Sequence, residues 1–441
     1  MEKSSTKRTL FILAWPILIE LLMLRLMGVF DTLMLSQFSD QAAAAVGFSN
    51  QVLMTAGVFL SVISMGTIIV VSQYLGANDV KGAHEVARVA LTSNMLVGLV
   101  VGVGLVVFTP SIVDWLHLPE ELQKEGVQYI AIVGGGFFLQ GLMVTFSALF
   151  KSHGLTKMTM YMMLGVNVLN LIGNAIVLFG LFGVPVFGVA GVAWVTVVSR
   201  GVGVLVFIVL LYHKLHLKRP LFTLQLRSKY MKSLFRIGAP SSVDAVAWNG
   251  HMLVITVLMA MLGTVALTSN VYANNLKMLI TMFAGAIGQG TLLLIARDVG
   301  AAQLEVAFRR TKVILNIALV LVFTTAVLMA LFSRPLLTVF SSNLEIIRTG
   351  SQLLMVAIIL ELGRSFNLVY NNALKAAKDV DYPMVVNILG MWCISVPFAF
   401  IFGMQWGLGV VGIWLAFTVD EWIRGLLLRR RWMTKHAPAN K

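Results

Sequence analysis

Residues 19–35 read IELLMLRLMGVFDTLML, an apolar stretch that nevertheless contains Glu20, Arg25 and Asp31. It continues an apolar run that begins near Leu10 and is long enough to cross a bilayer core of about 30 Å as a helix. A charged side chain near mid-bilayer costs at least about 2.5–3.5 kcal/mol, so it is retained where it faces protein or water. The stretch therefore predicts a membrane-spanning helix with a polar face directed into the protein, and Pro16 permits a kink near its start.

The whole chain has the composition of a membrane protein. Of its 441 residues, 58% are hydrophobic and 12% are charged, whereas soluble domains carry about 25% charged residues. The mean hydropathy is +0.88. Apolar runs separated by polar breaks predict an all-α protein with twelve transmembrane helices. These lie near residues 9–35, 42–73, 86–109, 127–150, 158–180, 186–212, 234–262, 264–296, 311–333, 348–374, 382–403 and 407–428.

Lysine and arginine are concentrated in one alternate set of the connections between these spans. The 213–233 loop and the residues after 428 are strongly basic, whereas the 110–126 connection is acidic. The positive-inside rule then predicts a multi-pass protein of the inner (plasma) membrane with both termini in the cytoplasm. The formal charge of +14 follows from this topology and needs no nucleic-acid partner.

The chain contains an internal repeat with a constant offset in numbering. The offset that superimposes Pro16 on Pro240 also superimposes Glu20 on Asp244, Gly66 on Gly290 and Lys151 on Lys375. Two six-helix copies that start on the same side of the membrane are parallel repeats, related by a pseudo-twofold axis along the membrane normal. We expect an amino-terminal lobe (1–212), a basic cytoplasmic linker (213–233), a carboxy-terminal lobe (234–428) and a basic cytoplasmic tail (429–441). Two such lobes favour a transporter.

Asp31 is the most informative ionisable residue of the first half. Glu20 and Asp31 share one helical face, because their spacing corresponds to about three helical turns, whereas Arg25 points away from both. Nothing nearby in sequence neutralises Asp31, which suits an acid that alternates between charged and neutral; a hydrogen-bonded acid in a packed lobe is the alternative. Asn167, Asn170 and Asn174 form one face of the 158–180 span, either to steady a carboxylate or to hold helices together.

A second polar cluster is predicted in the second half. Glu361 and Arg364 are spaced to pair within one helix, and Lys277 can reach Asp244 or Glu361 across helices. A structural ion pair is the favoured interpretation for Glu361 and Arg364. Asp420 and Glu421 are spaced to pair with Arg424, in a gating or anchoring role. The histidines are scattered, so neither a metal site nor an enzyme active site is predicted.

Several motifs in order resemble the multidrug and toxic compound extrusion (MATE) family along essentially the full chain. They are LAWPILIE and VFDTLMLSQFS in the first span, GTIIVVSQYLGANDVKGA after the second, NVLNLIGNAIVLFG in the fifth, GVAGVAWVTVVSR in the sixth, and ELGRSFNLVYNNALKAAKD around the tenth. The resemblance implies two six-helix bundles that export organic cations and other amphipathic drugs in exchange for H⁺ or Na⁺. No other cofactor is implied, and a monomer is expected.

The resemblance also implies site residues. It places Asp31 at the family's first-span aspartate, with Asn170, Asn174 and Thr196 as partners in an ion or proton site. Some branches have an aspartate where this chain has Asn174, which favours protons over sodium here, with Glu20 as the candidate for a second proton. A sodium site known from another branch is not carried over, because its two acids correspond to Trp248 and Arg364.

Three other functions stay open as alternatives. A lipid-linked oligosaccharide flippase of the same superfamily would need a cleft lined with many arginines. A membrane-embedded enzyme would need a catalytic constellation around His251, which stands alone in its span. A passive channel would not need a buried acid without a counter-charge.

Overall fold

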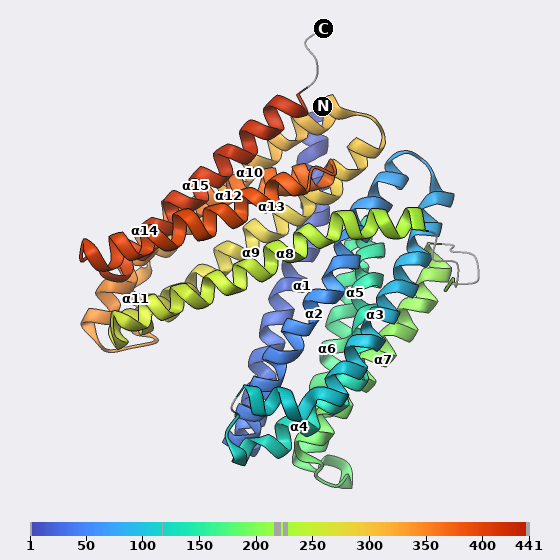
Figure 1. Cartoon of the computed structure of the whole chain (residues 1–441), viewed down its shortest axis with the longest axis vertical. Helices are drawn as coiled ribbons and strands as arrows, with labels where there is room; N and C mark the ends of the chain where they lie inside the picture. Colours follow the sequence, from blue (N-terminus) through green and yellow to red (C-terminus); the bar gives the residue numbers. More distant parts are fainter. Residues whose placement is uncertain (1, 117, 216–221, 224–227, 438–441) are drawn as a thin grey trace. The chain divides into compact units, whose positions relative to one another are not determined.

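The computed structural model describes residues 2–116, 118–215, 222–223 and 228–437, and all regular structure within these ranges is helical (Figure 1). The elements in chain order are α1 (Glu2–Phe38), α2 (Asp40–Gly76), α3 (Val80–Trp115), α4 (Glu120–Gly135), α5 (Phe137–Ser152), α6 (Thr156–Phe179), η1 (Leu181–Gly183), α7 (Gly188–Lys214), α8 (Ser228–Met261), α9 (Thr264–Gly300), α10 (Leu304–Leu331), α11 (Ser333–Thr338), α12 (Leu344–Ala376), α13 (Asp381–Leu389), η2 (Gly390–Ser395), α14 (Val396–Phe400), η3 (Ile401–Gln405) and α15 (Gly409–Lys435).

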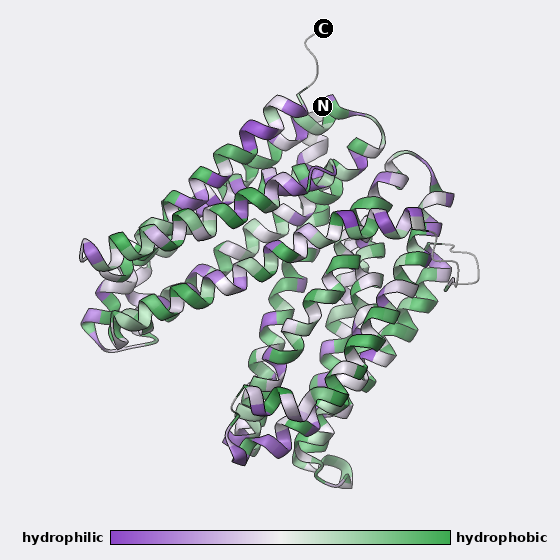
Figure 2. Cartoon of the chain, in the orientation of Figure 1, coloured by the Kyte–Doolittle hydropathy of each residue, from purple (hydrophilic) through white to green (hydrophobic). Residues whose placement is uncertain are grey.

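The predicted spans correspond to these helices. Ten helices are long and apolar enough to cross a membrane, and the bent pair α4 and α5 passes the same test when taken together. The twelfth predicted span, α15, carries Asp420, Glu421 and Arg424 within its length, which lowers its apolar character. Hydrophobic residues follow the shafts of the helices, and hydrophilic residues gather toward their ends (Figure 2).

The span predicted at 127–150 is broken into α4 and α5, which meet at an angle of 52°. The break falls at Gly135 and Gly136, where the missing side chains leave room for a neighbouring helix. A Cβ atom on Gly136 would lie 2.9 Å from the methyl groups of Val197 on α7. The bend therefore lets α7 pack against this span at close range.

The chain divides into two compact units. One consists of residues 1–18 with 240–441, and the other of residues 19–239. We call the first the carboxy-terminal unit and the second the amino-terminal unit. The divisions fall inside α1 and α8, next to Pro16 and Pro240. Proline removes a backbone hydrogen bond from a helix interior, which makes both positions places where a helix bends.

This division differs from the boundaries expected at the 213–233 linker, part of which lies outside the described residues. The first turns of α1 pack in the carboxy-terminal unit, and the first turns of α8 pack in the amino-terminal unit. Two glycines mark the exchange. A Cβ on Gly66 would lie 2.5 Å from the carbonyl oxygen of Leu234, and a Cβ on Gly290 would lie 3.0 Å from Cδ1 of Leu10. The repeat offset relates Gly66 to Gly290 and Leu10 to Leu234. The same glycine–leucine contact therefore occurs in both units.

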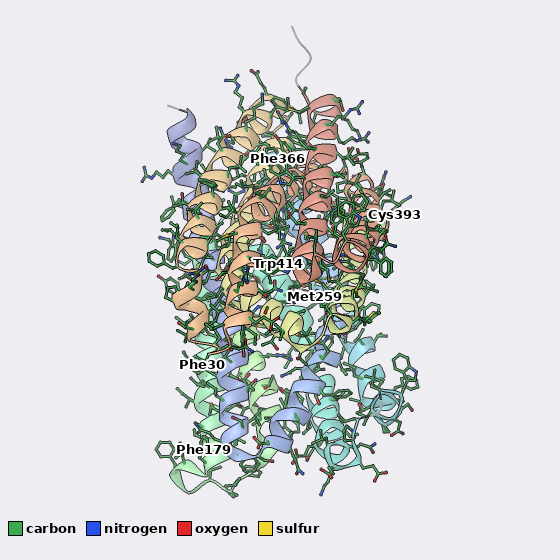
Figure 3. The ribbon with its side chains drawn as sticks, turned by 90° about the vertical axis from the view of Figure 1, so that its left-hand side faces the viewer. Phe30, Phe179, Met259, Phe366, Cys393 and Trp414 are labelled. Carbon is green, nitrogen blue, oxygen red and sulfur yellow. The ribbon has the colours of Figure 1, made fainter. Side chains whose placement is uncertain are left out.

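Each unit has its own apolar core. Tyr129 and Phe137 lie in the core of the amino-terminal unit. Met259 and Trp414, labelled in Figure 3, lie in that of the carboxy-terminal unit. By contrast, large apolar side chains such as Phe30 are exposed on the helix surfaces. Exposed aromatic and aliphatic residues of this number suit a surface whose solvent is lipid.

Candidate functional site

Asp31 lies at one end of a chain of side-chain hydrogen bonds that joins three helices of the amino-terminal unit. Asn174 Nδ2 on α6 donates to Asp31 Oδ1 on α1 at 3.0 Å and also reaches Asn170 Oδ1 at 3.1 Å. Asn170 Nδ2 in turn donates to Thr196 Oγ1 on α7 at 3.3 Å. The structure therefore brings together all four residues that the resemblance assigned to the ion or proton site. Within the described chain, Asp31 forms no salt bridge with a lysine or arginine.

Close packing of α6 against α7 creates this arrangement. A Cβ on Gly173 would lie 2.5 Å from Val195 Cγ1, and a Cβ on Gly191 would lie 2.9 Å from Val177 Cβ. These contacts fix an antiparallel register in which Asn170 faces Thr196. The glycines therefore position the polar residues although they carry no chemistry themselves.

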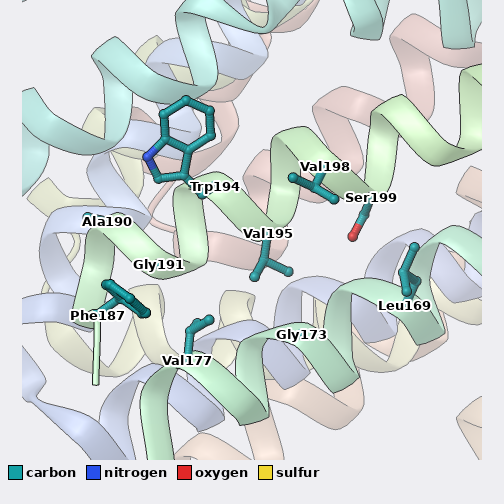
Figure 4. Close-up of a pocket in the computed structure, with 10 residues that line it drawn as sticks. All are labelled: Leu169, Gly173, Val177, Phe187, Ala190, Gly191, Trp194, Val195, Val198 and Ser199. Atoms are coloured by element: carbon teal, nitrogen blue, oxygen red, sulfur yellow. The ribbon is translucent and has the colours of Figure 1, made fainter. Parts of the chain in front are cut away.

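An apolar cavity of about 500 Å³ lies between the same two helices (Figure 4). It is lined by Leu169, Gly173, Val177, Phe187, Ala190, Gly191, Trp194, Val195, Val198 and Ser199. Positions 169 and 173 each precede one of the polar positions 170 and 174, a rotation of about 100° around α6. Helix α6 thus has a polar row toward Asp31 and an apolar row beside it.

Tyr129 and Asn50 extend the polar chain, and sequence reasoning did not find them. The Tyr129 hydroxyl donates to Asn50 Oδ1 at 3.4 Å and also lies within reach of Thr196. Tyr129 is 4% exposed. A single tyrosine in an apolar run gives no signal in sequence, since its role depends on which helix it faces.

Glu20 has a different environment from Asp31 although both lie on α1. Lys151 Nζ on α5 lies 2.8 Å from Glu20 Oε1, and Thr159 Oγ1 on α6 donates to Glu20 Oε2 at 3.4 Å. Glu20 as a whole residue is 6% exposed. Glu20 is therefore half of a buried ion pair, whereas Asp31 is held by an amide.

Asp244 makes the equivalent ion pair in the carboxy-terminal unit. Lys375 Nζ lies 3.3 Å from Asp244 Oδ2, and Asn387 Nδ2 donates to the same oxygen at 3.0 Å. The repeat offset relates this pair to Glu20 and Lys151, so both halves tie their first helix by the same contact. Lys277, for which Asp244 was one of two possible partners, lies instead 3.5 Å from Glu361.

The remaining charges of this unit form one buried network, which we call the second-lobe polar cluster. Its members are Lys277, Glu361, Arg364, Asp420, Glu421 and Arg424. Arg364 binds Glu361 at 2.9 Å and Glu421 at 3.1 Å. Arg424 binds Asp420 at 2.6 Å and Glu421 at 3.2 Å. The predicted pairings of Glu361 with Arg364 and of Arg424 with its two acids are confirmed, and three acids balance three bases.

The positions that correspond to the other branch's sodium site hold groups unsuited to a cation. The Arg364 guanidinium lies 5.9 Å from the centre of the Trp248 ring. His251 Nε2 lies 2.9 Å from Ser395 Oγ. In the part of the chain that the structure describes, no group of three histidine, cysteine, aspartate or glutamate side chains is arranged to hold a metal ion.

Comparisons with known proteins agree with this architecture. The MatE family model matches residues 16–176 and again residues 240–401, two segments whose starts are related by the repeat offset. The chain is 41% identical to the uncharacterized transporter YisQ of Bacillus subtilis, over 97% of this chain and 94% of that protein. It is 25% identical to the probable multidrug resistance protein NorM of Thermotoga maritima, over 97% and 92% of the two chains.

Solved structures show the same fold. A MATE structure in the bent conformation superimposes with a TM-score of 0.87 at 19% identity, covering 98% of this chain and 96% of that one. A MOP superfamily transporter from Pyrococcus furiosus superimposes with a TM-score of 0.85 at 19% identity, covering 97% and 96%. The predicted class of twelve transmembrane helices in two six-helix bundles is thereby confirmed. The chain belongs to the MatE family of multidrug and toxic compound extrusion (MATE) proteins, and it is a membrane transporter, not an enzyme.

Proposed function

We propose that this protein is a secondary active antiporter that exports lipophilic organic cations in exchange for protons, by alternating access of its two units. The observation that carries the proposal is the environment of Asp31. Its hydrogen-bonding partner is the Asn174 amide at 3.0 Å, and no base pairs with it in the described chain. Such a carboxylate can gain and lose a proton without breaking an ion pair. The description of several relatives as probable multidrug resistance proteins supports the substrate class.

The other buried acids are less suited to coupling. Protonating Glu20 would leave the ammonium of Lys151 without its counter-charge, and protonating Glu361 would do the same to Lys277. Removing one partner of a buried ion pair costs about 3–5 kcal/mol. Glu20 therefore serves as an anchor between α1 and α5, and Asp31 is the coupling residue.

Exchange of one proton for one monovalent cation moves no net charge across the membrane. The pH gradient alone then drives export, with about 1.4 kcal/mol, or a tenfold accumulation, for each pH unit. In the outward-open state Asp31 takes a proton from outside and the drug leaves. In the inward-open state Asp31 releases the proton to the cytoplasm and a new drug molecule binds.

Protons suit the Asp31 site better than Na⁺, which is the alternative coupling ion. A hard cation is held by several oxygen ligands, whereas Asn174 presents an N–H group to Asp31 and the Asn170 oxygen is already engaged. An amide donor stabilises the charged carboxylate after its proton has left. One carboxylate with one amide donor is a proton site of minimal size.

The distribution of charge supports an inner-membrane protein with both termini on the cytoplasmic side. Arg429, Arg430 and Arg431 lie in the last turns of α15, and Lys7 and Arg8 lie in the first turns of α1. Basic segments beside membrane helices stay on the cytoplasmic side. Each unit holds its own core, which is consistent with function as a monomer.

The proposal is tested by dye transport in inverted vesicles with pH and sodium gradients imposed separately. Inverted vesicles that contain the wild-type protein should accumulate ethidium when a pH gradient is imposed. Asp31→Asn, which keeps the shape and the hydrogen-bonding partner but cannot titrate, should lose gradient-driven accumulation. Undiminished accumulation by Asp31→Asn would refute the proposal.

A matched control separates coupling from folding. Asp114→Asn makes the same substitution at an exposed aspartate near the end of α3, and should leave coupling unchanged. If dye accumulation depended on the sodium gradient and not on the pH gradient, the coupling ion would be Na⁺ and not H⁺. Transport of a lipid-linked sugar without any ion gradient would favour the flippase alternative.

A further inference from the structure

Arg200 on α7 is a guanidinium without a counter-charge inside the amino-terminal unit. Its Nη1 atom is buried and has no hydrogen-bond partner among the described residues. The Tyr129 hydroxyl lies within electrostatic range of the guanidinium, and no carboxylate of the described residues pairs with it. The side chain as a whole is half-buried, so a small molecule can reach it.

The carboxy-terminal unit shows how a buried guanidinium is normally accommodated. Arg364 contacts two carboxylates, those of Glu361 and Glu421, and Arg424 contacts those of Asp420 and Glu421. A buried charge is costly unless it is paired and hydrogen-bonded, and a guanidinium cannot discharge itself by losing its proton. Arg200 therefore lacks the anionic partner that its environment calls for.

Asn167 on α6 lies at the same level as Arg200. A Cβ on Gly203 would lie 2.7 Å from Val166 Cγ2, and Asn170 contacts Thr196. In this antiparallel register the position one turn before Asn170 faces the position one turn after Thr196. Asn167 Nδ2 is also buried without a described partner, so two neighbouring donors both lack an acceptor.

Arg200 and Asp31 lie at opposite ends of one polar column. Asn174, which contacts Asp31, and Asn167 are seven residues apart, or about 10.5 Å along α6. Tyr129 is within electrostatic range of both Arg200 and Asp31. The column thus offers an acid at one end and a guanidinium with an amide donor about two helical turns away.

We propose that Arg200 and Asn167 form an anion subsite that binds the carboxylate of an amphipathic zwitterionic substrate. A guanidinium matches a planar carboxylate through two parallel hydrogen bonds. One guanidinium and one amide suit a monoanion and not a dianionic phosphate. Asp31, at the other end of the column, complements the cationic group of the same molecule. The substrate class rests on the proposed transport function, whereas the binding of a carboxylate at Arg200 does not.

A matched pair of dyes tests the subsite by equilibrium binding to the purified full chain in lipid nanodiscs. Rhodamine 110 carries a free carboxylate, and rhodamine 123 is its methyl ester on the same ring system. We expect Arg200→Met to weaken the binding of rhodamine 110 about tenfold or more, the effect of a lost charge-assisted hydrogen bond. Binding of rhodamine 123 should change by less than about twofold, because its ester presents no carboxylate to Arg200. Arg200→Lys should restore part of the affinity for rhodamine 110.

One further variant guards against misfolding and general effects. Arg236→Met removes an exposed arginine of the same unit and should leave both affinities unchanged.

The outcomes are decisive in both directions. Selective loss of rhodamine 110 binding in Arg200→Met supports the subsite. Equal loss of both dyes, or undiminished rhodamine 110 binding in Arg200→Met, overturns it. The assay uses no ion gradient, so failure of the coupling proposal, seen as unchanged ethidium transport by Asp31→Asn, remains separate from failure of the subsite.

Discussion

The two units differ in how they hold part of their buried charge. In the second-lobe polar cluster three acids and three bases contact one another, so every charge has a partner. In the amino-terminal unit Asp31 is held by the Asn174 amide. The repeat offset relates Asp31 to Ile255, which lies in an apolar core. The repeat thus reproduces the scaffold in both halves. Among the described residues, an acid held by an amide and not by a base lies at position 31 of the amino-terminal unit, whereas the equivalent position 255 is apolar.

The largest expected effect concerns proton release on drug binding. A cation that binds near Asp31 should expel its proton, whereas the balanced second-lobe polar cluster should release none. Weakly buffered protein mixed with ethidium should therefore acidify a pH-indicator dye. We expect Asp31→Asn to abolish the signal.

The control for this measurement is the double variant Lys277→Met/Glu361→Gln, which removes one base and one acid and keeps the cluster neutral. It should retain proton release. Loss of the signal in this variant, with ethidium still bound, would break the distinction between the two units and assign coupling to the carboxy-terminal one.

The next effect concerns stability. Glu361→Gln alone leaves Lys277 and Arg364 short of a buried counter-charge, so we expect a loss of about 3–5 kcal/mol in stability. The double variant Lys277→Met/Glu361→Gln should recover much of this loss because charge balance returns. Thermal unfolding of the detergent-solubilised protein measures both. If the two variants unfold at the same temperature, the cluster is not a charge-balanced network.

Alanine substitutions at Gly66 and Gly290 compare how tightly the first turns of α8 and of α1 pack in the two units. A Cβ on Gly66 meets the Leu234 backbone at 2.5 Å, whereas one on Gly290 meets the end of the Leu10 side chain at 3.0 Å. Backbone cannot yield as a side chain can, so Gly66→Ala should destabilise by about 1–3 kcal/mol and Gly290→Ala by less. Gly28→Ala is the control, because no atom lies within 4 Å of its added Cβ. Equal melting temperatures for the Gly66 and Gly290 variants would contradict this ranking.

Sequence reasoning predicted features that depend on local pattern. The twelve spans followed from apolar runs, the Glu361–Arg364 pair from helical spacing, and the repeat from a constant offset. The resemblance assigned Asn170, Asn174 and Thr196 to the Asp31 site, and the structure places them together.

Contacts across the fold were beyond that reasoning. Lys151 and Glu20 are 131 residues apart, and their pairing depends on how α1 packs against α5. The exchange of helix ends between the units was hidden because α1 and α8 are each continuous in sequence; Pro16 marked a kink but not which unit holds the first turns. Arg200 could be recognised as unpaired only after the positions of all acids were known.

The smallest expected effect concerns the turn between α12 and α13, outside the spans. The repeat offset relates Lys378 to Gly154, which occupies the equivalent turn, and both residues have positive φ. The next residue is Asp379 in one unit and Leu155 in the other. Burial opposes the charge of Asp379, but hydrogen bonds from Arg431 and Lys435 outweigh it and hold the pKa of that carboxyl below its usual value.

A lowered pKa in the folded protein stabilises it above the pKa of the unfolded chain, about 3.8 for Asp379, and this stabilisation is lost as the pH falls through the folded value. Asp379→Asn should therefore cost about 0.5–1 kcal/mol at neutral pH, discounted because Arg431 and Lys435 are partly exposed. The difference in melting temperature from wild type should shrink as the pH falls below about 4, and it should decrease in high salt. Leu155→Asn in the equivalent turn should show no such pH dependence, because that turn has no carboxylate to protonate. A difference between wild type and Asp379→Asn that persisted unchanged below pH 3 would mean that shape, and not charge, ties this turn to α15.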